Sequence, residues 1–288
     1  MNIEDIKNIC IIGAGNMGHQ IAVCCALAGY KVTCTDISQE MLDKAEAFAK
    51  TYLPERVTKG KLSQEQADRA LGNLGFTPSL EEAAGGADYI IEAAVEKMAI
   101  KRKLFADLDR IAPRHAILAT NSSYIVSSQI ADATKRPDKV CNMHFFNPAL
   151  VMKLVEVVQG PHTSEETAQI AMDLSTKLGK TAVWLKKEIY GFLVNRILSA
   201  LSQEALFLAE MGIATPEEID TAVTNALGHP MGPFRLMDLT GIDLTYYRTM
   251  ERYQNSGDLR LKPSPLVIEK FIKGEWGKKT NKGFYSYE

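Results

Sequence analysis

Cysteine is scarce in this chain, and its few cysteines are not spaced for metal binding. Five occur among the 288 residues, and none forms a CxxC motif. The odd count and the spacing argue against a disulfide framework and against a zinc site, so we predict no metal. All five lie in apolar segments, which predicts buried free thiols in a reducing compartment. They are Cys10, Cys24, Cys25, Cys34 and Cys141.

Long apolar runs and a strong charge imbalance are absent as well. No stretch approaches the roughly 20 apolar residues that a membrane span requires. The start of the chain carries Glu4 and Asp5, unlike the basic start of a secretory signal. A net charge of -2 argues against nucleic acid as the main partner. With 46% hydrophobic and 24% charged residues, we expect a globular cytoplasmic protein.

A glycine-rich turn follows the first apolar segment. Residues 9–12 read ICII, as expected of a strand that is buried on both faces. Gly13, Gly15 and Gly18 then form the pattern GxGxxG, and a helical pattern follows them. Such a turn lets the backbone approach a pyrophosphate, whose charge is favoured at the amino terminus of the helix. The strand, turn and helix together predict a dinucleotide-binding site.

Asp36 indicates which dinucleotide is bound. It ends the second predicted strand, residues 31–35, where a carboxylate can accept hydrogen bonds from the adenosine ribose. The same charge would repel the extra phosphate of NADP, and no arginine follows directly to bind it. An ordinary acid at a strand end is the alternative, which the preceding glycine motif disfavours. We therefore predict NAD as the cofactor.

Two more polar clusters follow predicted strands. Residues 89–91 precede the acidic segment 92–96, and residues 117–120 precede the Asn-Ser-Ser run at 121–123. In open α/β sheets, ligands bind at the carboxyl ends of the strands. We therefore expect both clusters to lie at the same edge of the sheet as Asp36.

The segment MHFFNPALVMKLVEVV, residues 143–158, places a histidine and an acid in apolar surroundings. Its two predicted strands are joined by a short loop, which can bring His144 and Glu156 side by side. A buried polar pair costs free energy unless its members satisfy each other. A carboxylate bonded to one imidazole nitrogen leaves the other nitrogen free to act as a base. A satisfied core histidine is the alternative, and the position near the predicted nicotinamide end favours the base.

A general base beside NAD implies that an alcohol is oxidised. The hydride goes to the cofactor, and His144 takes the hydroxyl proton. Ser123 could hydrogen-bond the substrate oxygen as the carbonyl develops. It could instead cap the helix that follows, and the two roles are compatible.

Two domains are predicted. Residues 1–188 alternate strand and helix patterns, which predicts an α/β domain with a Rossmann-type, mostly parallel sheet and a helical insertion at about 39–73. Residues 189–288 predict an all-helical substrate and dimerisation domain. Its helices are apolar on so many sides that we expect a homodimer through this part.

The middle of the helical insertion is basic. It carries Lys50, Arg56, Lys59 and Lys61. A solvated surface is the commoner reason for such a cluster. The alternative is a site for the phosphate of a substrate.

With these residues, the chain resembles the (3S)-3-hydroxyacyl-CoA dehydrogenases, in particular the stand-alone 3-hydroxybutyryl-CoA type, over essentially its whole length. It contains, in family order, GAGNMG, IEAAVE, NSS, HFFNP, MKLVEVV, GFLVNRI, HPMGPF and GKKTNKGFY. The resemblance implies NAD-dependent interconversion of (3S)-3-hydroxyacyl-CoA and 3-oxoacyl-CoA, on short acyl chains.

The resemblance also implies roles for individual residues. His144 would be the catalytic base and Glu156 its partner, while Ser123 and Asn195 would contact the acyl-CoA substrate. The residues that match NAD-contacting positions of the family are Gly13, Ala14, Gly15, Asn16, Met17, Gly18, Asp36, Glu96, Lys101, Asn147 and Lys279.

The match to the family is looser at two places. Lys59 lies at about the position of a lysine that reaches the CoA phosphates, and Lys50 and Arg56 are alternatives for this role. Where the family commonly has Pro-Gly-Phe, this chain has Tyr190-Gly191-Phe192. Tyrosine lacks the fixed backbone angle of proline, so we expect a more mobile domain junction and a differently shaped acyl pocket.

Two other functions are weighed against this one. A related dehydrogenase of a free sugar acid would lack a CoA phosphate site, and the basic insertion argues against it. A crystallin-like NAD-binding protein without enzymatic activity would need only the nucleotide site. The joint presence of His144, Glu156, Ser123 and Asn195 argues against this second alternative.

Overall fold

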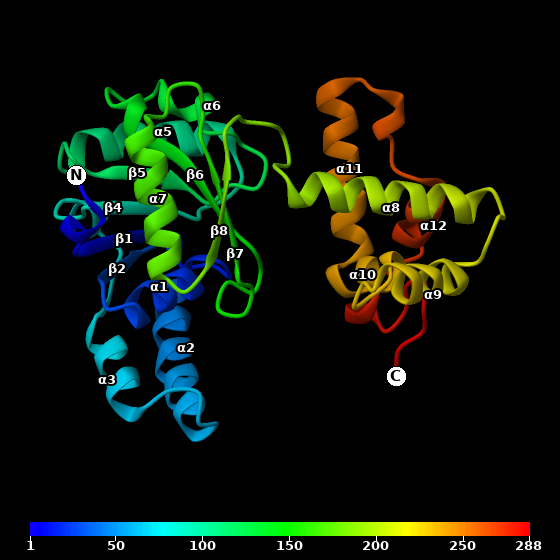
Figure 1. Ribbon diagram of the computed structural model, residues 1–288, viewed down its shortest axis with the longest axis horizontal. Helices are drawn as coiled ribbons and strands as arrows, with labels where there is room; N and C mark the ends of the chain where they lie inside the picture. Colours follow the sequence, from blue (N-terminus) through cyan, green and yellow to red (C-terminus); the bar gives the residue numbers. More distant parts are fainter. The chain divides into compact units, whose positions relative to one another are not determined.

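The computed structural model describes residues 1–288, except for the side chains of Asn255 and Ser256. The chain divides into two compact units, Met1–Leu193 and Val194–Glu288 (Figure 1). The first unit contains an eight-stranded sheet with helices, and the second unit is helical. This confirms the predicted fold class, a Rossmann-type sheet domain followed by an all-helical domain. In the described part of the chain, none of the helices has the length and hydropathy needed to cross a membrane.

The strands of the first unit lie in the order β3-β2-β1-β4-β5-β6-β7-β8. Their bounds are β1 (Asn8–Ile12), β2 (Lys31–Thr35), β3 (Leu74–Thr77), β4 (Tyr89–Glu92), β5 (Ile117–Thr120), β6 (Val140–Phe145), β7 (Leu154–Val158) and β8 (Thr181–Leu185). All neighbouring pairs are parallel except β6 and β7, which are antiparallel. The chain runs outward from β1 to β3 and then continues on the other side of β1 with β4. Ligands bind beside such a change of direction in open α/β sheets.

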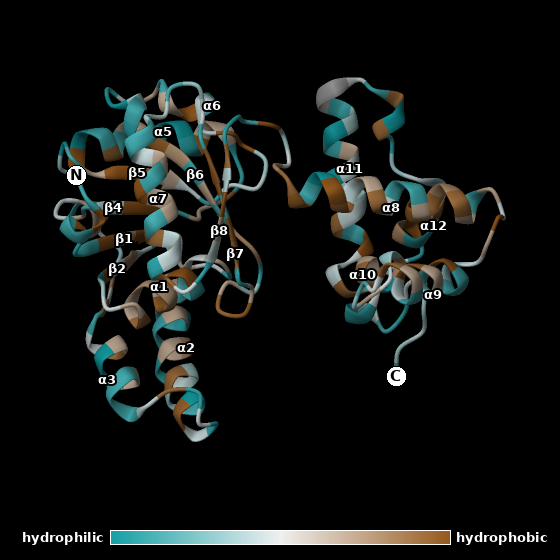
Figure 2. Cartoon of the chain, in the orientation of Figure 1, coloured by the Kyte–Doolittle hydropathy of each residue, from teal (hydrophilic) through white to brown (hydrophobic). Residues whose placement is uncertain are grey.

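Both faces of the sheet are buried. Ile9 and Ile11 of β1 pack into the core on one face, whereas Cys10 and Ile12 pack into the core on the other. Alternate residues of a strand point to opposite faces, so a strand that is covered twice must be apolar throughout. The central strands are accordingly brown in Figure 2.

Helices connect the strands of the first unit. They are α1 (Gly18–Leu27), α2 (Gln39–Thr58), α3 (Gln64–Gly72), α4 (Leu80–Ala84), α5 (Met98–Ile111), α6 (Ser128–Ala131) and α7 (Glu165–Lys177), with short 3-10 helices η1 (Ile3–Asp5) and η2 (Pro137–Lys139). The predicted insertion corresponds to α2 and α3, which extend from the sheet as a helical pair in Figure 1. Ser38 and Ser63 cap the two helices with their side chains. The pair ends in β3, an edge strand that the sequence pattern does not predict.

The second unit contains five α-helices and two short 3-10 helices. They are α8 (Val194–Glu210), α9 (Pro216–Leu227), α10 (Pro233–Thr240), α11 (Ile242–Ser256), η3 (Leu259–Leu261), α12 (Pro265–Ile272) and η4 (Lys278–Thr280). The rings of Phe234 and Phe284 meet in its core, with centroids 4.8 Å apart. The buried carboxylate of Asp238 accepts hydrogen bonds from the amides of Phe284 and Tyr285 and from the hydroxyl of Tyr287. The carboxyl-terminal segment is therefore fixed to α10.

All five cysteines are buried, as predicted. Burial raises the pKa of Cys34 and of Cys141 to about 12. A thiol must lose its proton to act as a nucleophile, so these side chains act as apolar packing groups.

Candidate active site

The glycine-rich turn between β1 and α1 is tightly packed at Gly13 and Gly18 and has free space at Gly15. Gly13 has a φ of 96°, and a Cβ on it would lie 2.6 Å from the carbonyl oxygen of Ala93. A Cβ on Gly18 would lie 1.7 Å from the carbonyl oxygen of Gly13. Among the described residues, by contrast, no atom lies within 4 Å of a Cβ built on Gly15. The turn therefore packs closely on the sheet and leaves room above Gly15, at the start of α1, where a pyrophosphate fits.

Asp36 lies beside this turn at the end of β2. Its Oδ2 accepts a hydrogen bond of 2.8 Å from the amide of Ala14, and its Oδ1 accepts one of 2.9 Å from the amide of Ser38. Ser38 in turn caps α2 with its side chain. The carboxylate is thus held in one orientation next to the glycine turn, as a ribose-binding acid requires.

Two of the predicted cofactor residues contact each other across a long stretch of sequence. The side-chain amide of Asn16, in the glycine turn, donates a hydrogen bond of 3.0 Å to Oδ1 of Asn147. Asn147 lies in the loop between β6 and β7 and precedes a cis peptide bond to Pro148. The loop after the His144 strand is therefore joined to the glycine turn.

A cavity of about 290 Å³ opens at the carboxyl ends of β4 and β5, next to Met17 of the glycine turn. It is lined by Met17, Ala93, Ala94, Glu96, Lys101, Asn121, Ser122, Ser123 and Tyr124. Four of these are predicted site residues, namely Met17, Glu96, Lys101 and Ser123. The cavity lies beside the point where the strand order reverses, between β1 and β4. The nicotinamide end of a dinucleotide is expected there.

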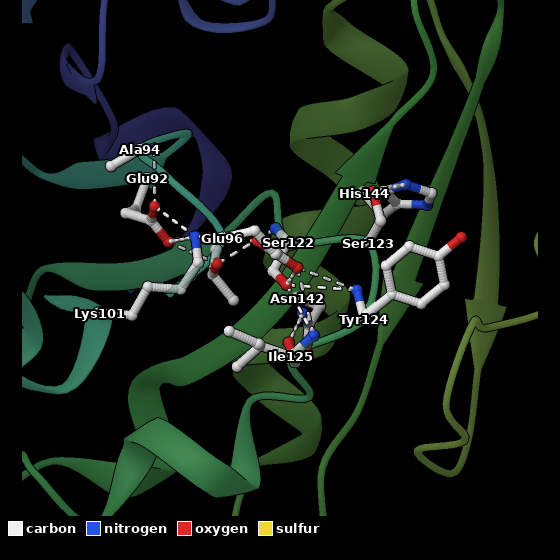
Figure 3. A network of polar contacts seen from close by, with 11 residues as sticks. Glu92, Ala94, Glu96, Lys101, Ser122, Ser123, Tyr124, Ile125, Asn142 and His144 are labelled. Carbon is white, nitrogen blue, oxygen red and sulfur yellow. Dashed lines mark hydrogen bonds and ion pairs between the residues drawn. The ribbon is translucent and has the colours of Figure 1, made fainter. Parts of the chain in front are cut away.

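Buried charges support one wall of this cavity (Figure 3). Nζ of Lys101 lies 2.6 and 2.8 Å from the two carboxylate oxygens of Glu92 and 3.4 Å from Oε2 of Glu96. Glu92 is fully buried, and the side chain of Lys101 is 1% exposed. Glu96 accepts hydrogen bonds from the Ser122 hydroxyl and from the amide of Tyr124, at 3.2 Å for the latter. The network thereby holds the turn that carries Ser123.

His144 and Glu156 form a direct pair. In the antiparallel register of β6 and β7 they lie opposite each other, so their side chains project to the same face. His144 Nδ1 lies 2.8 Å from Oε2 of Glu156, and Nε2 lies 3.1 Å from Oγ of Ser123. The side chains of His144 and Glu156 are 4% and 0% exposed. The structure therefore brings together three of the four residues predicted to act on the substrate.

Two aromatic rings pack against the imidazole. The ring of Phe146 lies 4.6 Å from that of His144, and the ring of Phe192 lies 5.4 Å from it. Phe192 is fully buried and has a φ of 48°, which is unusual for a residue with a side chain. The next amide, that of Leu193, donates a hydrogen bond of 3.0 Å to Oε1 of Glu156. The segment after β8 is thus fixed to the same carboxylate that orients His144.

The basic residues of the insertion lie elsewhere in the first unit. Lys50 forms an ion pair of 2.6 Å with Glu46, and Lys59 forms one with Glu55. The guanidinium of Arg56 lies over the ring of Tyr52. Arg56 also lines a cavity of about 460 Å³ whose other basic residues are Lys61, Lys153, Lys177 and Lys180.

The last two predicted site residues belong to the second unit. Asn195 lies in the first turn of α8. Lys279 lies in η4, with its Nζ 2.5 Å from Oδ2 of Asp243.

Several residues of the site carry no clear signal in the sequence. Phe192 and Phe146 read as ordinary core residues, and Glu92 reads as one acid of a polar cluster. Asn121 accepts at its Oδ1 a hydrogen bond of 2.8 Å from the amide of Phe145, next to His144. Glu92 and Asn121 belong to the two polar clusters predicted at this edge of the sheet, and the sequence does not show which partners they bind.

The double hydrogen bonding of Glu156 predicts that Glu156→Gln destabilises the first unit. A carboxamide has one acceptor oxygen, so it cannot accept from both His144 and Leu193, and we expect a loss of about 1–3 kcal/mol in the free energy of unfolding. Urea unfolding measures this change. Glu166→Gln, at an exposed ion pair with the amino terminus, is the control and should leave the stability unchanged. Wild-type stability of Glu156→Gln would contradict the two-bond arrangement.

Nearly the whole chain matches two family models of the 3-hydroxyacyl-CoA dehydrogenases. Residues 8–189 match the family model described as 3-hydroxyacyl-CoA dehydrogenase, NAD binding domain, and residues 191–287 match that of the C-terminal domain of the same enzymes. A probable 3-hydroxybutyryl-CoA dehydrogenase of Bacillus subtilis is 41% identical, over 99% of this chain and 98% of the relative. A 3-hydroxybutyryl-CoA dehydrogenase of Clostridioides difficile is 39% identical, over 97% and 99%.

Solved structures agree with the sequence relatives. The crystal structure of (S)-3-hydroxybutyryl-CoA dehydrogenase from Ralstonia eutropha superimposes with a TM-score of 0.92 at 36% identity, covering 99% of this chain and 100% of that one. Together with the glycine turn and the His144–Glu156 pair, these matches show the family of the chain. The chain belongs to the 3-hydroxyacyl-CoA dehydrogenase family and is an NAD-dependent oxidoreductase.

Proposed function

We propose that the substrates are short-chain (3S)-3-hydroxyacyl-CoA esters such as 3-hydroxybutyryl-CoA, which the enzyme interconverts with 3-oxoacyl-CoA. The observation that carries the proposal is the imidazole of His144, tied to Glu156 through Nδ1 and facing Ser123 through Nε2. Relatives named for 3-hydroxybutyryl-CoA support the short acyl chain.

His144 is the general base of the proposed reaction. An ionised carboxylate only accepts hydrogen bonds, so the bond to Glu156 places the proton of the neutral imidazole on Nδ1 and a lone pair on Nε2. Nε2 takes the proton of the 3-hydroxyl group during oxidation and returns it during reduction. Glu156 stabilises the imidazolium between these steps. Bound NAD would supply the acceptor for the hydride that leaves C3 of the substrate.

Ser123 and Asn195 are the proposed substrate-binding residues. Ser123 Oγ already lies at hydrogen-bonding distance from Nε2 of His144, so a substrate hydroxyl at this place can contact both side chains. A hydroxyl donor there stabilises the charge that develops on the substrate oxygen. Asn195, at the start of α8, is assigned to the acyl-CoA by family resemblance.

The NAD-binding residues follow the geometry of the turn and the cavity. The glycine turn would hold the pyrophosphate, Asp36 the adenosine ribose, and Glu96 and Lys101 the wall beside the nicotinamide. Further residues proposed for NAD are Gly13, Ala14, Gly15, Asn16, Met17, Gly18, Asn147 and Lys279.

Arg56 is the best placed of the three candidates for the CoA phosphates. Lys50 and Lys59 are paired with acids of their own helix, although such exposed pairs are weak. Among the described residues Arg56 has no acidic partner, and it lines the basic cavity with Lys61 and Lys153. A guanidinium can also bind a phosphate through two parallel hydrogen bonds.

A homodimer in the cytoplasm completes the proposal. The second unit exposes large apolar side chains, among them Phe207 at 53%, Ile213 at 68% and Ile272 at 76%. Exposed apolar surface of this kind favours association. The five buried thiols suit a reducing compartment.

Replacing the proposed base tests the function directly. His144→Gln should lower the turnover of acetoacetyl-CoA with NADH by roughly 10²–10⁴-fold, because the proton is no longer transferred by a positioned base. NADH binding, followed by fluorescence, should persist. His115→Gln, at an exposed histidine paired with Asp88, is the control and should retain activity. Unchanged turnover of His144→Gln would exclude the assignment.

The proposed role of Asp36 predicts a change of cofactor preference. Asp36→Ala removes the carboxylate that repels the extra phosphate of NADP, so the ratio of kcat/KM for NADH over NADPH should fall at least roughly tenfold. Asp43→Ala, at an exposed acid of α2, should leave the ratio unchanged. If Asp36→Ala also leaves it unchanged, Asp36 does not select the cofactor.

The proposed CoA phosphate site predicts an effect that depends on the substrate's phosphates. Arg56→Met should raise the KM for acetoacetyl-CoA by about 3- to 10-fold with little change in kcat, because uniform binding is lost. The KM for the truncated thioester of N-acetylcysteamine, which has no phosphates, should not change. Lys44→Met, on the same helix, is the control. An equal rise for both thioesters would show that Arg56 acts through packing.

A further inference from the structure

The ion network of Glu92, Lys101 and Glu96 contains two acids and one base. The carboxylate of Glu92 accepts hydrogen bonds from the amide of Ala94 at 2.7 Å and from the hydroxyl of Thr120 at 2.6 Å. The ammonium of Lys101 donates to both of its oxygens. Every one of these partners is a donor. An ionised carboxylate only accepts hydrogen bonds, which matches the donors around Glu92.

Glu96 is surrounded in the same way. Its Oε1 accepts from the hydroxyl of Ser122 and from the amides of Tyr124 and Ile125, and its Oε2 faces Lys101 at 3.4 Å. Two carboxylates therefore share a single ammonium. The network of Glu92, Lys101 and Glu96 carries a formal charge of about -1.

This charge lies in the wall of the cavity next to the glycine turn. Glu96 and Lys101 line the cavity directly, and Glu92 lies behind Lys101 without exposed surface. The nicotinamide ring is positively charged in NAD⁺ and neutral in NADH. A negative wall therefore stabilises the oxidised form more than the reduced form.

We propose that Glu92 is a positioning residue that raises the affinity for NAD⁺ relative to NADH by neutralising Lys101, so that the charge of Glu96 remains uncompensated at the nicotinamide. The inference rests on the proposed function, since it requires the nicotinamide to occupy this cavity. Without Glu92, the Lys101 ammonium pairs with Glu96 alone, and the wall becomes neutral. Lys101 then moves toward Glu96, which also loosens the turn at Ser122.

Binding of the two cofactor forms tests this proposal without relying on turnover. The Kd values of NAD⁺ and NADH are measured by calorimetry and fluorescence for each variant. Glu92→Gln should lower the ratio Kd(NADH)/Kd(NAD⁺) by roughly 3- to 10-fold, the effect of one unit charge at a partly solvated site. The double variant E92Q/K101M restores a wall charge of -1 and should restore the wild-type ratio.

A control and a second comparison keep the test decisive. Glu166→Gln removes one exposed negative charge in the first turn of α7, where Glu166 pairs with the amino terminus and does not line the cavity, and should not change the ratio. If Glu92→Gln does not fold, E92Q/K101M is compared with E92Q/K101M/E96Q, and the loss of the last charge should lower the ratio in the same range. Replacing a whole buried ion pair is better tolerated than removing one partner.

Failure of the inference can be told apart from failure of the proposed function. A ratio that does not follow the wall charge, in a protein that binds both cofactor forms and reduces acetoacetyl-CoA, would overturn the role of Glu92 alone. A wild-type protein that binds NADH and does not act on acetoacetyl-CoA would overturn the proposed function.

Discussion

Antiparallel pairing of β6 and β7 sets His144 directly opposite Glu156. A carboxylate with no exposed surface is strongly destabilising unless donors surround it, and here the donors are the imidazole of His144 and the amide of Leu193. One buried acid thereby fixes the orientation of the imidazole and the start of the segment that leaves the sheet domain. The rest of the site is arranged around this imidazole: Ser123 lies at its free nitrogen, and Phe146 and Phe192 pack against its ring.

A second buried acid follows the same logic three strands away. Glu92, at the end of β4, collects Lys101, Thr120 and the amide of Ala94, and the resulting network holds the turn that carries Ser123. Glu156 orients His144 directly, whereas Glu92 supports the turn that carries Ser123. Glu92 ends β4, and Glu156 lies in β7 opposite His144, which is near the end of β6. The fold itself thus brings the base, the serine and the cofactor turn to the same edge of the sheet.

The sequence predicts the parts of the molecule whose signal is local. GxGxxG between an apolar strand and a helix, with Asp36 at the end of the next strand, depends only on neighbouring residues. The insertion is predicted as helical, and the structure contains it as the helices α2 and α3. β3 is missed because it is a half-buried edge strand of four residues with a glycine, and neither alternation nor an apolar run marks it.

The chain by itself determined the sheet domain, the choice of NAD and the identity of the histidine and its acid, since each follows from residue types at short spacing. Only the tertiary structure decided how charges are shared. Lys101 of α5 is held by Glu92 at the end of β4, and Arg56 of α2 lines a cavity together with Lys153 and Lys180. A sequence shows which groups carry charge. Which of them neutralise one another depends on distances of a few ångströms between residues on different strands and helices, and packing alone sets those distances.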